Sequence, residues 1–174
     1  MSTRHLVLTV IGDDRPGIVE QLATAISSHH GNWLESSMAH LAGKFAGIVE
    51  VSVDSDHLDP LNAALEDLPG LRVTAEETGG DLPSATGQHL TLSLVGHDRI
   101  GIVREVSQVL AQHGVNVEAL NTFTASAPMS AEILFHADAD LLAAATADID
   151  ALRRSLEALS DDLMVDIRQA SRED

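Results

Sequence analysis

The sequence contains no cysteine among its 174 residues. Without thiols the chain can form no disulfide bond, no thiolate nucleophile, no iron–sulfur cluster and no cysteine-ligated zinc site. Nine histidines are present, but they show neither an HExxH motif nor a comparable metal-ligand spacing. We therefore expect no metal site and no cofactor.

Basic residues are scarce. Ten Lys and Arg residues stand against 27 Asp and Glu residues, which gives a formal net charge of −17, and Lys44 is the single lysine. Binding nucleic acid requires clustered Lys and Arg that neutralise phosphates, and anionic membrane surfaces attract the same clusters. The composition therefore argues against direct nucleic-acid binding and against a membrane partner.

Long hydrophobic runs are also missing. No apolar stretch approaches the length needed to cross a bilayer, and the first residues enter a strand-like pattern without a basic segment followed by a long apolar one. Hydrophobic residues still make up 44% of the chain, which is enough for a packed core. We expect a folded cytoplasmic protein.

An octapeptide that occurs twice dominates what is present. Residues 12–19 (GDDRPGIV) return as residues 96–103 (GHDRIGIV), identical at six of the eight positions. Each copy follows an alternating apolar run and precedes an amphipathic one. Such a repeat indicates that one supersecondary unit has been duplicated. Because the two units account for nearly the whole chain, little is left for a catalytic or DNA-reading domain.

Hydrophobic periodicity predicts the same order of elements in both halves. We expect strands at 5–11, 32–42, 45–54 and 71–78 with helices at 16–30 and 57–68, followed by strands at 88–95, 115–125, 129–137 and 163–169 with helices at 100–113 and 141–159. The segment 42–44 (AGK) predicts a hairpin turn. Asp14 and Asp98 are candidate helix N-caps, and Pro16 suits a first helical turn.

Each half therefore reads β-α-β-β-α-β, and the predicted fold class is α+β. It consists of two ferredoxin-like domains, each an antiparallel four-stranded sheet with both helices on one face. We expect the domains at 1–78 and 88–169, a Gly/Pro/Ser-rich linker at 79–87 and a frayed tail at 170–174. Halves this small bury little apolar surface alone, so we expect them to pair with each other or within a homo-oligomer.

Residues 10–19 (VIGDDRPGIV), with 29–32 (HHGN) and 35–38 (ESSM) downstream, resemble the opening of an ACT domain. The second half resembles it less closely, through residues 96–103 and 113–117 (HGVNV). Two such domains with almost nothing else resemble the glycine cleavage system transcriptional repressor family. Ile100 stands where the first copy has proline, His97 replaces Asp13, and Trp33 replaces a smaller aliphatic residue.

The resemblance implies a regulatory module. ACT domains typically bind an amino acid or another small metabolite where two domains meet, through the loop between the first strand and helix. The repressor family is thought to contact a DNA-bound transcriptional regulator instead of binding DNA. By resemblance, the expected ligand is a small amino acid, with glycine as the first candidate, and the expected protein partner is a transcriptional regulator.

The repeated loop also has its own chemistry for ligand capture. A helix N-terminus offers free N–H groups and partial positive charge to a carboxylate, while a neighbouring Asp can receive an ammonium group. The candidate ligand-binding residues are Gly12, Asp13, Asp14, Arg15, Pro16, Gly17, Ile18, Asn32, Gly96, His97, Asp98, Arg99, Gly101, Ile102 and Asn116.

A purely structural interpretation stays open for the same loop. The aspartates would then cap helices, and Gly17 and Gly101 would only permit close packing. The chain would serve as an oligomerisation or protein-interaction module without a small-molecule ligand. Asp13-Asp14 has no recognisable second acid, base or nucleophile, so we expect no catalytic residues and no enzyme.

Overall fold

The computed structural model describes residues 2–79 and 85–170, which belong to two compact units, Met1–Pro83 and Ser84–Asp174. We call their described parts the first and the second domain. The expected linker at 79–87 lies partly outside the described residues, and so does the expected tail apart from Ala170.

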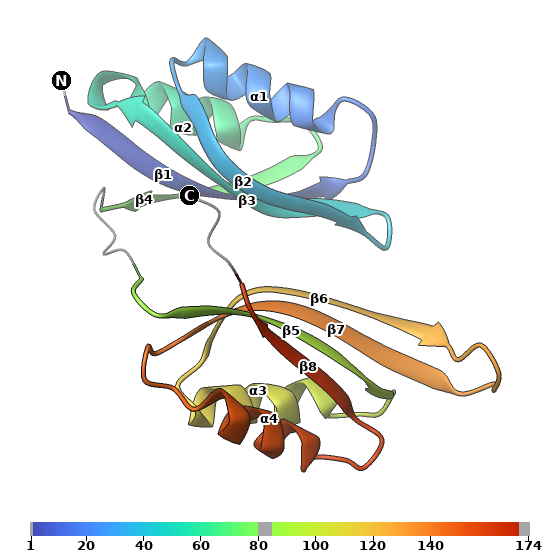
Figure 1. The fold of residues 1–174 in the computed structure, drawn as a ribbon. Coiled ribbons are helices and arrows are strands. Elements are labelled where there is room, and N and C mark those ends of the chain that lie inside the picture. Colours follow the sequence, from blue (N-terminus) through green and yellow to red (C-terminus); the bar gives the residue numbers. More distant parts are fainter. Residues whose placement is uncertain (1, 80–84, 171–174) are drawn as a thin grey trace. The chain divides into compact units, whose positions relative to one another are not determined.

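The first domain has the predicted β-α-β-β-α-β order. Its elements are β1 (Thr3–Asp13), α1 (Ile18–Ser28), β2 (Asn32–Leu41), β3 (Lys44–Asp54), the 3-10 turn η1 (Ser55–His57), α2 (Leu58–Glu66) and β4 (Leu71–Thr78). The strands form one antiparallel sheet in the order β2-β3-β1-β4, and both helices lie on the same face of it (Figure 1).

The second domain repeats this topology. Its elements are β5 (Gln88–His97), α3 (Ile102–Gln112), β6 (Asn116–Ser126), β7 (Ile133–Ala143), α4 (Ile149–Glu157) and β8 (Met164–Gln169). The sheet order is β6-β7-β5-β8, again antiparallel, with α3 and α4 on one face (Figure 1). The predicted fold class is confirmed in both halves.

Strict alternation along the central strands separates a buried face from an open face. Leu6, Leu8 and Val10 of β1 are almost fully buried, while the intervening side chains point away from the helices. Leu22 of α1 and Leu61 of α2 cover this face, and the buried residues of each helix recur at helical spacing. Each domain thus holds its own core between one sheet and two helices.

The predicted hairpin at 42–44 is confirmed, and it is tight. Leu41 pairs with Lys44, which leaves Ala42 and Gly43 as a two-residue turn with φ of 50° and 80°. Positive φ at both positions matches the twist of the flanking strands. The turn brings Lys44 opposite Asp13 at the end of β1.

The predicted boundary between strand 129–137 and helix 141–159 is wrong. Strand β7 continues to Ala143 and α4 begins only at Ile149. Asp138 and Asp140 interrupt the apolar run in the sequence, but they alternate with buried residues and lie on the open face. The period is therefore two, not 3.6, across this segment.

The helix starts also differ from the prediction. Asp14 and Asp98 cap no helix, and Pro16 lies in a turn before α1. The N-cap positions belong to Gly17 and Gly101, both left-handed with φ of 85° and 91°. This backbone conformation strongly favours glycine, which explains why the glycine recurs in both copies of the repeat.

The ends of α1 and α3 show how the repeat has diverged. The left-handed position after the helix is His30 in the first domain, with φ of 60°, and Gly114 in the second, with φ of 66°. Gly31, the expected helix stop, lies one residue later. This position requires glycine because a Cβ there would lie 2.8 Å from the Ile26 side chain.

Candidate functional site

The repeated loop joins the first strand of each domain to its first helix. Ile18 and Ile102 begin the helices, and both side chains are buried in the cores. Ile100, by contrast, is fully exposed. The buried isoleucines anchor the loop, so any contact with a ligand falls to the loop backbone and to the polar side chains around it.

The first loop is held by polar contacts to segments far away in the sequence. Asp13 forms an ion pair with Lys44. The backbone N–H of Asp14 donates to the carbonyl of Gly43 at 3.0 Å, and Arg15 donates to the carbonyl of Pro69 at 3.3 Å. The β2–β3 turn and the α2–β4 turn therefore meet at this loop.

A hollow of about 460 Å³ opens between these segments. The residues that line it are Ile11, Gly12, Asp13, Lys44, Gly70, Leu71 and Arg72. We call it the first-domain hollow. Gly12 is required at its wall, because a Cβ at this position would lie 2.5 Å from the carbonyl oxygen of Gly70.

Three of the basic residues of the first domain lie at or beside the first-domain hollow, where Asp13 balances the charge of Lys44. The sequence of the first domain has four Lys and Arg residues. Lys44 and Arg72 line the hollow, and the guanidinium of Arg15 lies 3.5 Å from where a Cβ of Gly70 would be. The fourth, Arg4, pairs with Glu77 at the opposite end of β1. The sequence pattern did not reveal this grouping, since the residues lie far apart in the chain.

The second loop is held differently. His97 stands where the first domain has Asp13, and its ring lies 3.0 Å from Glu132 and 2.9 Å from Asp162. The backbone N–H of His97 also donates to Oδ2 of Asp162 at 2.7 Å. The Asp98 N–H donates to the carbonyl of Ile133 at 3.0 Å, as Asp14 does to Gly43.

These contacts shift the ionisation of both loops. The hydrogen bond from Lys44 and its charge lower the pKa of Asp13. The carboxylates of Glu132 and Asp162 raise the pKa of His97. The pKa of Asp162 falls to about 2, chiefly because it accepts hydrogen bonds from the Ser160 hydroxyl and the His97 backbone. Asp162 is therefore ionised at neutral pH.

The arginine of each loop has a different neighbour. Arg15 donates to the neutral side chain of Gln21, whereas Arg99 forms an ion pair with Glu105. This pair raises the pKa of Arg99 and lowers that of Glu105. The charge of Arg99 is thus balanced within the second domain, while Arg15 keeps a net positive charge beside the first-domain hollow.

The structure does not bring Asn32 and Asn116 to the loops of their own domains. Asn32 pairs with Ser52, which also faces His5, whereas Asp13 faces Lys44 at the other end of β1. Eight residues separate His5 from Asp13, so this distance along the strand is about 26 Å. Asn116 pairs with Leu142, which also faces His89, and so lies at the same far end of its sheet.

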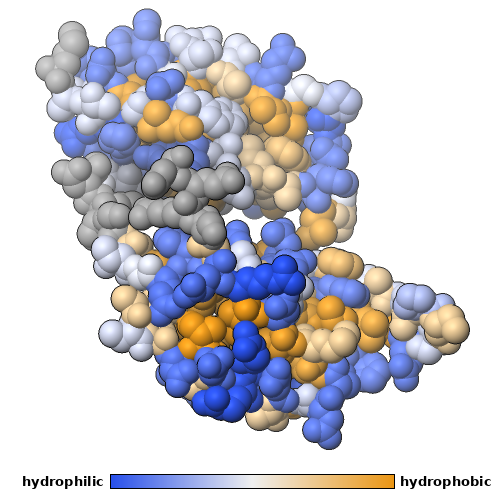
Figure 2. Space-filling view, viewed as in Figure 1, coloured by the Kyte–Doolittle hydropathy of each residue, from blue (hydrophilic) through white to orange (hydrophobic). Residues whose placement is uncertain are grey.

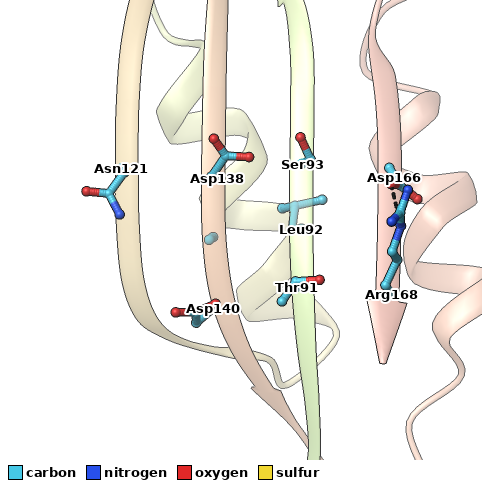
Figure 3. Close-up of a pocket in the computed structure, with 9 residues that line it drawn as sticks. Thr91, Leu92, Ser93, Asn121, Asp138, Asp140, Asp166 and Arg168 are labelled. Atoms are coloured by element: carbon cyan, nitrogen blue, oxygen red, sulfur yellow. Dashed lines mark ion pairs between the residues drawn. The ribbon is translucent and has the colours of Figure 1, made fainter. Parts of the chain in front are cut away.

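A further hollow, which the sequence did not indicate, lies on the open face of the second sheet. Its volume is about 410 Å³. Figure 3 shows its polar lining, drawn from four neighbouring strands: Thr91, Ser93, Asn121, Asp138, Asp140, Asp166 and Arg168. Arg168 is engaged by Asp166, with 2.9 Å between the charged atoms, so the remaining carboxylates make this face acidic.

Residues 2–79 and 85–170 contain no group of three or more His, Asp or Glu side chains arranged to hold a metal ion. None of the helices in this part of the chain has the length and apolar character to span a membrane. The hydropathy of one side of the surface, with polar and apolar patches intermixed, is shown in Figure 2.

Comparison with family models identifies both domains. Residues 4–70 and residues 90–154 each match a model of the ACT domain. Together the matches cover most of the chain, in agreement with the two ferredoxin-like units and the repeated strand–loop–helix. The chain therefore belongs to the ACT-domain family and carries two copies of the domain.

Among the solved structures that resemble this chain, two illustrate a match over its full length. An unknown protein from Galdieria sulphuraria is 28% identical, with a TM-score of 0.82 over 98% of this chain and 100% of that one. A "putative glycine cleavage system transcriptional repressor" is 18% identical, with a TM-score of 0.74 over 99% of this chain and 100% of that one. The second likeness is one of fold. No curated protein matches the sequence.

Proposed function

We propose that this tandem ACT-domain protein is a regulator that binds a small amino acid at the first-domain hollow and thereby modulates a protein partner. Several features support this. ACT domains typically bind amino acids at this loop, and the hollow combines a loop backbone with the side chains of Lys44 and Arg72, with Arg15 close to Gly70 at its edge. The observation that carries the proposal is that Arg72 lines the hollow beside the Asp13–Lys44 ion pair, with Arg15 next to Gly70 at its edge, in a protein with a net charge of −17.

The chemistry of the hollow suits a zwitterion. Lys44, Arg72 and the loop backbone offer donors to a carboxylate. Asp13, which lines the hollow, offers a carboxylate to an ammonium group. A simple anion would meet the overall negative charge of the protein, whereas a zwitterion carries no net charge to be repelled.

Glycine is our first candidate ligand, and a DNA-bound transcriptional regulator our candidate partner. Both follow from the resemblance to glycine cleavage system repressors and from the description of the structural neighbour. The scarcity of basic residues supports action through a protein and not through direct DNA contact. We place this activity in the cytoplasm, without catalysis or a cofactor, and in a homo-oligomer.

A thermal-shift panel of the twenty amino acids, followed by calorimetry on each hit, tests the ligand. A ligand present at 100 times its Kd stabilises the folded state by about 2.7 kcal/mol. We expect Arg72→Met to weaken binding at least tenfold, because a guanidinium at the hollow is lost. Arg4→Met is the matched control, since it removes the same charge at the far end of β1. Equal effects of both variants would overturn the assignment of the site.

The second candidate function is an interaction module without a ligand. It is favoured by strand β6, an edge strand whose every residue is exposed. Leu120 and Phe123 on it are each about half exposed, at 50% and 54%. Unpaired edge strands are templates for association. If no amino acid shifts the melting temperature while sedimentation shows self-association that Phe123→Lys weakens, this function replaces the first.

A further inference from the structure

Gly70 and Asp162 occupy equivalent positions in the two domains. Each immediately precedes a leucine that packs on the glycine near the end of the first strand. A Cβ on Gly12 would lie 2.9 Å from the Leu71 side chain, and a Cβ on Gly96 would lie 2.7 Å from the Leu163 side chain. The first domain thus has no side chain where the second has a carboxylate.

In the second domain one oxygen of this carboxylate is engaged by the loop and the other by Ser160. Oδ2 of Asp162 accepts the His97 backbone N–H at 2.7 Å and lies 2.9 Å from Nδ1 of the same residue. Oδ1 accepts the hydroxyl of Ser160. Charge-assisted hydrogen bonds of this kind are about twice as strong as neutral ones.

In the first domain the corresponding N–H belongs to Asp13. The neighbouring Asp14 N–H donates to Gly43 on the β3 side. Since alternate residues of an extended strand turn to opposite sides, the Asp13 N–H faces the β4 side. Pairing between β1 and β4 ends one residue earlier, at Gly12 and Leu71, and the first-domain hollow begins there.

The two loops also differ in the charged residues that the neighbouring strands bring beside them. Asp13 is paired across the sheet with Lys44, whereas His97 is paired with Leu134. Ile11 is paired with Arg72, whereas Val95 is paired with Met164. The second domain therefore has neither cation that lines the hollow of the first, has His97 in place of Asp13, and has the carboxylate of Asp162 where the first domain has Gly70.

We propose that Asp162 is an internal carboxylate that closes the second loop, and that the equivalent position in the first domain receives the carboxylate of a free amino acid. The two ACT domains then have different tasks. Each chain binds one amino acid, in the first domain. In the second domain the loop N–H already has Asp162 as its acceptor. The ligand half of this inference rests on the proposed function, whereas the closure of the second loop does not.

Residue-resolved NMR of the full chain separates the two halves of the inference. In the first arm, glycine is titrated into the wild-type protein. We expect the amide resonance of Asp13 to move and that of His97 to stay, and calorimetry to give one glycine per chain. Movement of both amides, or two glycines per chain, would overturn the division of tasks.

In the second arm no ligand is added. Asp162→Ala should move the His97 amide resonance and bring the pKa of the His97 ring closer to 6.5, because one of its two carboxylate neighbours is lost. Asp161→Ala is the matched control, since it removes the same charge one residue earlier. Asp162→Asn, which preserves the shape of the side chain, replaces the alanine variant if that variant does not fold.

The two arms fail in different ways. If glycine and the other amino acids move no amide in the wild type while Asp162→Ala moves that of His97, the ligand half fails together with the proposed function, and the closure of the second loop stands. If the amide resonance of His97 and the pKa of its ring are unchanged in both Asp162→Ala and Asp161→Ala, the proposal that Asp162 closes the second loop is refuted, whether or not glycine binds.

Discussion

Gly12→Ala tests the architecture of the first loop most directly. The added Cβ would lie 2.5 Å from the carbonyl oxygen of Gly70 and 2.9 Å from the Leu71 side chain. The Leu71 methyl can move, but the Gly70 carbonyl belongs to the backbone of the α2–β4 turn. Atoms at such distances overlap, so the turn must shift away from β1.

Overpacking a close contact typically lowers the free energy of unfolding by about 1–3 kcal/mol. With an m value of about 1 kcal/mol/M, at the low end for small proteins, the urea midpoint would fall by about 1–3 M. The same shift would widen the first-domain hollow, so we also expect weaker ligand binding in this variant.

Trp33 offers a domain-specific assay for this change. It is the single tryptophan of the chain, and it packs against the core of the first domain. We expect the urea transition followed by its fluorescence to move to lower urea in Gly12→Ala. Gly96→Ala is the matched control, because its Cβ would clash mainly with the end of the Leu163 side chain in the other domain. A Trp33 transition unchanged by Gly12→Ala would refute the steric argument.

Three further predictions concern pH, a helix cap and a loop conformation. The pKa of His97 is raised by folding, so its contribution to stability is present below about pH 6.5 and lost as the pH rises through the folded pKa. A series of urea titrations at different pH values, followed by circular dichroism, should show this loss as a falling urea midpoint. Glu132→Gln should make the loss smaller. Asp148→Ala should cost about 1 kcal/mol, because this side chain accepts the Ala151 N–H at 3.0 Å as the N-cap of α4, while Asp150→Ala should cost less in the same urea titration. Gly17→Ala should lower the free energy of unfolding by about 1–2 kcal/mol through its φ of 85° alone, since a Cβ there meets no atom within 4 Å. A loss above about 3 kcal/mol in a urea titration followed by Trp33 fluorescence would show that other contacts are broken.

The sequence alone predicted the two βαββαβ units. The repeated loop marked the duplication, and alternation with period two marked β1, β3 and β5 because each of these strands buries one face. The turn at Ala42 and Gly43 was also predictable, since local residue types determine such turns. The candidate ligand residues remain a prediction, and the structure places all of them except Asn32 and Asn116 at the two loops.

Local patterns failed where a distant contact decided the outcome. Asp14 has the residue type of an N-cap, but its N–H donates to the carbonyl of Gly43 in the neighbouring hairpin, and Gly17 takes the N-cap position. Asp138 and Asp140 break an apolar run in the sequence, yet they lie in the middle of a strand because the open face of the sheet accepts charge.

The sequence by itself therefore determined the duplicated fold, because periodicity, turn residues and the recurring glycines act over a few neighbouring positions. Only the tertiary structure decided what differs between the copies. Lys44 and Arg72 line one hollow because β3 and β4 both pair with β1, and Asp162 reaches His97 because β8 pairs with β5. Such pairings depend on the register of whole strands, which no local pattern around either residue encodes.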